Sequence, residues 1–225
     1  MNIVCLGDSV TKGRVWAEGD RPRITRNNYP ALLARLLPGA NVINAGVTGD
    51  TSGDLLARFE TSVAAHHPEV VVIEGGGNDC NFRWADVAAE PTADHAPIVS
   101  ERTFAANLAA LVERARSIGA KSILTTLPPL DSARYYAYLR QIYSDAIAPF
   151  ICRVGGIYYW HERYSRIVGD VGRASGAAVA RVRELFLSTG DFFCLISHDG
   201  IHPSEAGYRI VAQAVYQALL AVLPA

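Results

Sequence analysis

Four short apolar segments constrain the fold of this chain more than any other feature of its sequence. Each has the length of a β-strand and lacks polar alternation; the segments are residues 3–6, 41–44, 70–73 and 122–125. Strands of this kind are typical of parallel sheets that are covered by helices on both faces. A fifth and more weakly marked strand is expected near residues 177–182.

Longer stretches with helical spacing of their apolar residues separate these segments. They cover residues 29–37, 54–65 and 103–117, a Tyr- and Ile-rich region at 132–175, and a last helix that starts at Pro203-Ser204-Glu205. Regular alternation of strands and helices predicts an α/β fold with a parallel sheet. No repeat or linker interrupts the pattern, so we expect a single domain over residues 1–225.

Composition excludes several classes of protein. Half of the residues are hydrophobic (50%) and the net charge is -1, which argues against disorder and against a general nucleic-acid binder. No apolar run approaches the roughly 18–20 residues of a membrane span, and the first residues do not resemble a secretory signal. We therefore expect a cytoplasmic protein without integral membrane association. The four cysteines are dispersed, which predicts neither a zinc site nor a disulfide framework.

Polar and glycine-rich segments directly follow three of the predicted strands. They are Gly7-Asp8-Ser9, Asn44-Ala45-Gly46 and Gly76-Gly77-Asn78-Asp79. Ligands of open α/β sheets bind outside the carboxyl ends of the strands, where these segments would meet. Taken singly, each segment is also compatible with an ordinary helix cap or turn.

A second group of candidate residues stands just before the last helix, in Asp199-Gly200-Ile201-His202. A hydroxyl nucleophile needs a base within hydrogen-bond reach and a partner that orients the base. Asp199 can orient His202, and His202 can accept the proton of Ser9. The backbone N–H groups of Ser9 and Gly46 and the amide of Asn78 are candidate donors to an oxyanion.

These segments together resemble the SGNH hydrolases, also called GDSL esterases and lipases. The residues that carry the resemblance are Ser9, Gly46, Asn78 and His202, each within its block. The resemblance implies a flavodoxin-like three-layer α/β/α sandwich with a five-stranded parallel sheet. It implies a Ser9–His202–Asp199 triad, an oxyanion hole of Ser9, Gly46 and Asn78, and no metal or other cofactor. The expected activity is a serine esterase acting on short-chain or carbohydrate-linked carboxylic esters, with lysophospholipase, thioesterase and acyltransferase activities as alternatives.

Aromatic residues near these blocks are candidates for contact with a small-molecule ester. They are Trp16, Phe82 and Trp84. We expect His66, His67 and His161 to be surface residues, because none of them has metal-ligand spacing. A phosphate- or flavin-binding protein is the alternative from another class, since Thr48-Gly49-Asp50-Thr51-Ser52 could cradle a phosphate. The oligomeric state is left open.

Overall fold

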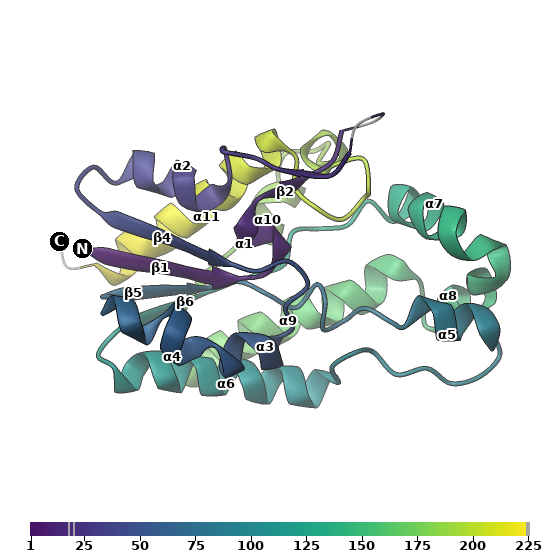
Figure 1. Ribbon diagram of the computed structural model, residues 1–225, viewed down its shortest axis with the longest axis horizontal. Coiled ribbons are helices and arrows are strands. Elements are labelled where there is room, and N and C mark those ends of the chain that lie inside the picture. Colours follow the sequence, from purple (N-terminus) through teal and green to yellow (C-terminus); the bar gives the residue numbers. More distant parts are fainter. Residues whose placement is uncertain (18, 20, 224–225) are drawn as a thin grey trace.

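A five-stranded parallel sheet forms the centre of the computed structural model, which describes residues 1–17, 19 and 21–223 (Figure 1). In spatial order its strands are β4 (Asn41–Gly46), β1 (Asn2–Gly7), β5 (Val70–Ile73), β6 (Lys121–Thr125) and β7 (Ala178–Ala180). All four neighbouring pairs are parallel. The predicted α/β fold with five parallel strands is confirmed, and the fifth strand is shorter than expected.

Helices cover both faces of this sheet. On one face lie α2 (Tyr29–Leu36), α10 (Val182–Leu187) and α11 (Glu205–Val222); on the other lie α3 (Ser52–Ala57), α6 (Glu101–Ser117) and α9 (Ile157–Ser175). Alternate residues of β1 enter the two layers, because Ile3 and Cys5 pack in one apolar cluster and Val4 and Leu6 in the other. Both faces of the strand are therefore buried, which explains why its sequence is apolar without alternation.

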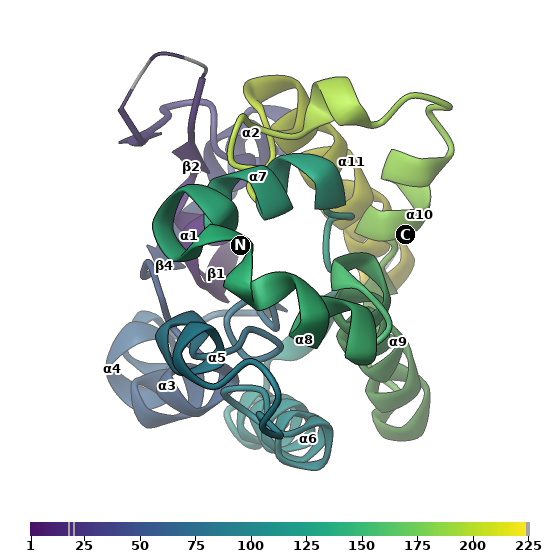
Figure 2. The same cartoon turned by 90° about the vertical axis from the view of Figure 1, so that its right-hand side faces the viewer.

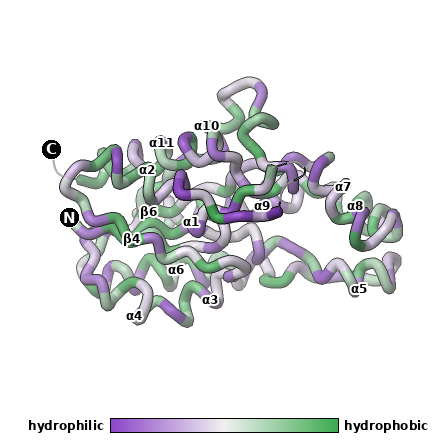
Figure 3. Tube along the Cα trace, turned by 45° about the horizontal axis from the view of Figure 1, so that its top comes forward, coloured by the Kyte–Doolittle hydropathy of each residue, from purple (hydrophilic) through white to green (hydrophobic). Residues whose placement is uncertain are grey.

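The helices themselves start where side chains can cap them. Ser100 accepts a hydrogen bond from the N–H of Thr103 at the start of α6, and Ser204 caps α11 in the same way. Hydrophobic and hydrophilic stretches alternate along the covering helices (Figure 3), as expected for helices with one face on the sheet. No helix in the described part of the chain is long and apolar enough to cross a membrane.

One predicted helix, over residues 54–65, is divided in the structure. It consists of α3, α4 (Phe59–Ser62) and a 3-10 turn, η1 (Ala64–His66). The division falls at Arg58, whose side chain turns toward the sheet and donates to Asp50 and to the carbonyl of Gly7. The prediction was therefore right about helical content and wrong about continuity.

The region 132–175 is likewise divided, into α7 (Ser132–Tyr143), η2 (Ser144–Ile147), α8 (Ala148–Arg153) and α9. Gly155 and Gly156 separate the last two with positive φ angles of 87° and 93°. Helices α7 and α8 lie with α5 (Trp84–Ala89) beyond one end of the sheet (Figure 1), and Figure 2 shows them in front of it.

The order of the strands indicates where a ligand site lies along the carboxyl ends of the strands. Numbered along the chain, the five strands have the order 2-1-3-4-5, in which the first and third strands, β1 and β5, lie side by side. Connections leave these two strands in opposite directions, which opens a crevice at their carboxyl ends. The short helix α1 (Ser9–Lys12) follows β1, and the loop with Asn78 follows β5. A hairpin of β2 (Arg14–Val15) and β3 (Arg23–Ile24) borders this end, and η3 (Phe193–Leu195) leads toward His202.

Candidate active site

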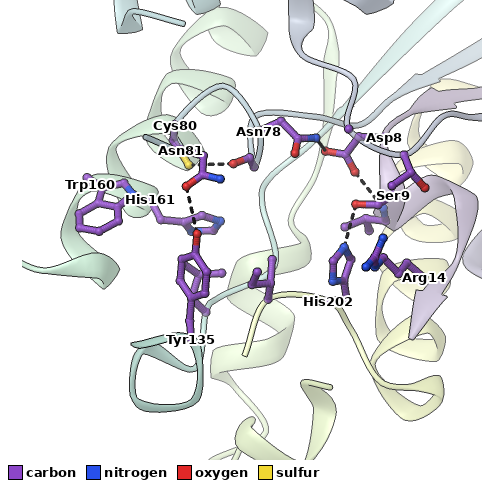
Figure 4. Close-up of a pocket in the computed structure, with 16 residues that line it drawn as sticks. Asp8, Ser9, Arg14, Asn78, Cys80, Asn81, Tyr135, Trp160, His161 and His202 are labelled. Atoms are coloured by element: carbon purple, nitrogen blue, oxygen red, sulfur yellow. Dashed lines mark hydrogen bonds between the residues drawn. The ribbon is translucent and has the colours of Figure 1, made fainter. Parts of the chain in front are cut away.

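Three polar side chains form a hydrogen-bonded array at this crevice, and Figure 4 shows two of them, Ser9 and His202. Ser9 Oγ lies 2.8 Å from His202 Nε2, although the two residues are 193 positions apart in the chain. His202 Nδ1 lies 2.5 Å from Asp199 Oδ2. All three side chains are largely buried. The structure thus brings together the serine, histidine and aspartate that the sequence singled out.

Local backbone geometry holds each member of the array. Asp8 precedes Ser9 and accepts a hydrogen bond from the N–H of Val10 over 2.8 Å, which places Ser9 on the first turn of α1. Asp199 Oδ1 accepts from the N–H groups of Ile201 and His202 at 3.0 and 3.1 Å. The same carboxylate therefore builds the turn and, through its other oxygen, orients the imidazole.

The charge of Asp199 follows from its surroundings. Burial raises the pKa of this carboxyl, but the hydrogen bond from His202, the charge of that residue and two backbone N–H groups outweigh it, so the net pKa lies below its ordinary value. Asp199 is therefore ionised at neutral pH, and its carboxylate accepts a hydrogen bond from the protonated Nδ1 of His202. The lone pair of Nε2 is then left facing the hydroxyl of Ser9.

A pair of buried acids lies directly behind Ser9. Glu74 Oε2 accepts from Thr11 Oγ1 at 2.8 Å and from the N–H groups of Asp8 and Thr11 at 3.2 Å. Burial, followed by the charge of Glu74, raises the pKa of Asp8 well above its ordinary value, and burial also raises the pKa of Glu74. The raised pKa values show that the surroundings favour the protonated, neutral forms of both carboxyls, which oppose negative charge developing near Ser9 less than two carboxylates would.

A cavity of about 170 Å³ opens beside Ser9 and His202. Its rim includes the exposed residues Thr48 and Gly49 and the half-buried Arg14 and Asn78. Its inner end is closed by residues that are at least nine-tenths buried, namely Cys80, Leu130, Tyr135, Trp160 and His161. The hydroxyl of Ser9 therefore faces a small chamber with an open side and a closed side.

Comparison with known proteins identifies the family. Residues 5–210 match the GDSL-like Lipase/Acylhydrolase family. The chain belongs to this family. This acylhydrolase is 33% identical to the esterase TesA of Pseudomonas aeruginosa over 205 residues, which cover 88% of this chain and 81% of TesA. It is 26% identical to an acetylxylan esterase of Geobacillus stearothermophilus, with 94% and 90% of the two chains covered.

Solved structures support the fold of this acylhydrolase. The lipase/acylhydrolase from Enterococcus faecalis superimposes with a TM-score of 0.72 at 23% identity, covering 99% of this chain and 97% of that one. Together with the family match, the Ser9–His202–Asp199 array makes this chain a carboxylic ester hydrolase of the GDSL type.

Gly46 is not placed as an oxyanion donor in this acylhydrolase. Its N–H donates to Asn44 Oδ1 over 2.9 Å, and the residue does not line the cavity. A Cβ added to Gly46 would lie 2.3 Å from the backbone nitrogen of Lys12. The glycine is required because β4 and α1 approach closely here, which is a packing role.

Gly49 occupies the place on the cavity wall that the sequence assigned to Gly46. It has a φ of 93°, and within the described residues its N–H takes part in no hydrogen bond. Asn78 also lines the cavity, as expected; its Nδ2 donates to the carbonyl of Asp50 at 2.8 Å and to Asp8 Oδ2 at 3.2 Å. Gly46 is the last residue of β4 and Gly49 lies in the loop after it, so only the path of that loop shows which of them reaches the cavity.

The three aromatic residues proposed for substrate contact do not line the cavity. Trp16 packs edge-on against Tyr138 with ring centroids 5.4 Å apart. Phe82 and Trp84 are buried in an aromatic cluster behind the wall, where Phe82 contacts Trp160 at 5.2 Å. These three rings pack against other aromatic side chains instead of lining the cavity, and Trp160 is the tryptophan that reaches it.

His161 was expected at the surface but lies in the wall of the cavity, with only 5% of its surface exposed. Its helix α9 buries this face against the loop that follows β5, a contact that spacing along the sequence does not reveal. His66 and His67 are exposed, as expected.

Two of the three hydroxyls in the loop considered for phosphate binding, those of Thr51 and Ser52, are engaged by carboxylates. Thr51 Oγ1 donates to Asp54 Oδ2 over 2.7 Å, and Ser52 Oγ donates to Asp79 Oδ1 over 2.5 Å. Carboxylates at these positions would repel a phosphate. Within the ranges described, no group of three His, Cys, Asp or Glu side chains is arranged to hold a metal ion.

Proposed function

We propose that this acylhydrolase is a serine esterase specific for short acyl groups. The observation that carries the proposal is the Ser9–His202–Asp199 array, with a 2.8 Å contact from hydroxyl to imidazole, at the mouth of a cavity of only about 170 Å³. In this proposal Ser9 is the nucleophile, His202 the general base and acid, and Asp199 the residue that orients His202.

Ser9 Oγ attacks the ester carbonyl carbon while its proton passes to His202 Nε2. The tetrahedral intermediate collapses as His202 returns that proton to the leaving alcohol oxygen, which leaves an acyl group on Ser9. Water then enters, gives its proton to His202 and attacks the acyl carbon. Collapse of the second intermediate releases the acid and restores the Ser9 hydroxyl.

Negative charge on the carbonyl oxygen requires donors that are positioned before the reaction. We assign this role to the backbone N–H groups of Ser9 and Gly49 and to Asn78 Nδ2. Asn78 donates over a longer distance to Asp8 (3.2 Å) than to Asp50 (2.8 Å). Its bond to Asp8 is the one that we expect to be exchanged for the oxyanion.

The size of the cavity supports a short acyl group. Pockets for drug-sized ligands typically measure about 300–1,000 Å³, and this cavity is about 170 Å³ with a closed inner end. Acetyl to butyryl groups match that volume better than the long chains of lysophospholipids or fatty thioesters. An alcohol half that leaves through the open rim can be larger, and the acetylxylan esterase among the relatives makes acetylated carbohydrates a natural substrate class to test.

The test is a series of p-nitrophenyl esters from acetyl to palmitoyl, together with acetylated sugars. We expect kcat/KM to be highest for two to four acyl carbons and to fall at least tenfold by eight. Leu130→Ala enlarges the cavity and should shift the preference to longer chains, whereas Leu127→Ala is a matched control, because Leu127 is equally buried but does not line the cavity. Highest activity on chains of ten carbons or more would contradict the proposal.

A further inference from the structure

His161 is a buried polar side chain in the catalytic cavity with no role in the chemistry just described. Its Nδ1 is shielded from solvent and has no hydrogen-bond partner. The described hydrogen bonds do not include Nε2 either, and Figure 4 shows the ring directed into the cavity. An unpaired polar group in such a place costs free energy unless a ligand satisfies it.

The protonation of His161 follows from the residue behind it. Burial, and then the charge of Arg183, lower the pKa of His161 to about 3, so the imidazole is neutral at any working pH. Arg183 is itself buried, stacks on the ring of Tyr158 at 4.5 Å and has two guanidinium nitrogens without partners. Nδ1 is shielded from solvent and has no partner, so a proton placed there could not be hydrogen-bonded, whereas a proton on Nε2 can meet an acceptor in the cavity. The proton therefore resides on Nε2, which makes His161 a donor toward the cavity.

Asn81 supplies a second donor on the same wall. Its Oδ1 accepts three hydrogen bonds, from Trp84 Nε1 at 2.8 Å and from Tyr135 Oη and the N–H of Phe82 at 3.0 Å each. These donors fix the orientation of the amide, so its Nδ2 points away from them. Asn81 lines the cavity, and in Figure 4 its nitrogen is directed into it.

The closed end of the cavity is thus apolar on most sides but carries two neutral N–H donors. The acyl group of a substrate occupies this end, because the leaving oxygen must stay beside His202 at the rim. Resting on the proposed function, we infer that His161 and Asn81 form a subsite for a hydrogen-bond-accepting oxygen within the acyl group, as in alkoxy- or oxo-substituted short acyl esters. An unsubstituted alkanoyl chain leaves both donors unpaired.

Two isosteric substrates test this subsite, p-nitrophenyl methoxyacetate and p-nitrophenyl butyrate. They differ by one ether oxygen in place of a methylene, and the measured quantity is the ratio of their kcat/KM values. Comparing this ratio between variants cancels the difference in intrinsic reactivity of the two esters. His161→Leu removes the donor, and we expect it to lower the ratio roughly 3- to 10-fold, as for one neutral hydrogen bond.

Two further variants separate this role from mere packing. His161→Gln can place an amide N–H near the position of Nε2 and should keep the ratio within about twofold of the wild type. Asn81→Asp keeps the oxygen that accepts from Trp84 and Tyr135 but removes the Nδ2 donor, so it should lower the ratio even if His161→Leu fails to fold. A ratio unchanged in both His161→Leu and Asn81→Asp overturns the inference. A wild-type chain that hydrolyses neither ester refutes the proposed function instead, and the subsite with it.

Discussion

Replacing Asp199 by Asn changes one atom of the array and tests how its hydrogen bonds produce activity. Asparagine can keep an oxygen toward the N–H groups of Ile201 and His202, so the turn is preserved. The atom facing His202 Nδ1, now 2.5 Å from a carboxylate oxygen, becomes an amide NH₂. A donor there requires an unprotonated Nδ1, which moves the ring proton to Nε2 and removes the lone pair that accepts the proton of Ser9.

The expected loss is large because the wrong tautomer is held in place. Tautomer reversal of this kind costs roughly 10⁴ in kcat in serine hydrolases, which corresponds to about 5.5 kcal/mol of activation free energy. The assay is the steady-state hydrolysis of p-nitrophenyl acetate, with KM expected to change little because Asp199 does not contact the ester. Thermal unfolding of the same samples checks that the variant is folded.

Asp131→Asn is the matched control for this substitution. Asp131 is also a buried aspartate, and it caps α7 by accepting from the N–H of Arg134, a role that asparagine fills equally well. We expect its kcat to stay within about twofold of the wild type. A folded Asp199→Asn variant that retains more than a tenth of the wild-type kcat would refute the orienting role of Asp199.

Three other predictions concern the oxyanion site, the fold and the buried acids. Asn78→Ala should lower kcat by a factor of roughly 10²–10³ if the amide donates to the oxyanion. An unchanged kcat would exclude Asn78 as an oxyanion donor. Gly46→Ala should strongly lower the unfolding midpoint in urea, since its Cβ would lie 2.3 Å from a backbone nitrogen. Gly53 lies in α3 with its nearest neighbouring atom 3.6 Å from an added Cβ, so Gly53→Ala should raise the free energy of unfolding by up to about 1 kcal/mol. Equal effects of the two substitutions would contradict this contrast. Because the pKa values of Glu74 and Asp8 are raised, the folded state binds more protons than the unfolded state above the ordinary carboxyl range of about 4. Stability contributed by these protons is therefore lost as pH rises. Glu74→Gln should lessen that loss in urea unfolding measured from pH 4 to pH 9, and parallel stability curves for the two proteins would refute a role of the raised pKa values.

Much of the fold was predictable from the sequence because a strand that is buried on both faces appears there as a short, uninterrupted apolar segment. The strand at Val70–Ile73 was placed with its observed bounds, since four apolar residues between polar neighbours fit only such a position. The breaks within the long helical regions were not predictable. They depend on contacts such as that of Arg58 with the carbonyl of Gly7, which exist only in the assembled structure.

In the candidate site too, residues marked by their local sequence could be predicted, whereas those placed by tertiary contacts could not. Ser9, Asp199 and His202 could be found because their chemistry requires particular residue types next to strand ends and a helix start. Gly46 and Gly49 could not be separated, since the choice depends on where a loop bends. His161 was missed because the side of α9 that faces the cavity is decided by packing against segments distant in the sequence.

The central claim is that Ser9 carries the acyl group during turnover. Intact-mass and peptide mass spectrometry after treatment with a fluorophosphonate, which traps activated serine nucleophiles, measures this directly. We expect one adduct per chain, located on the peptide that contains Ser9, with loss of p-nitrophenyl acetate hydrolysis in proportion to labelling. Ser9→Ala should take up no label and show no turnover above background. A stoichiometric adduct on another residue, or full activity in Ser9→Ala, would contradict the account.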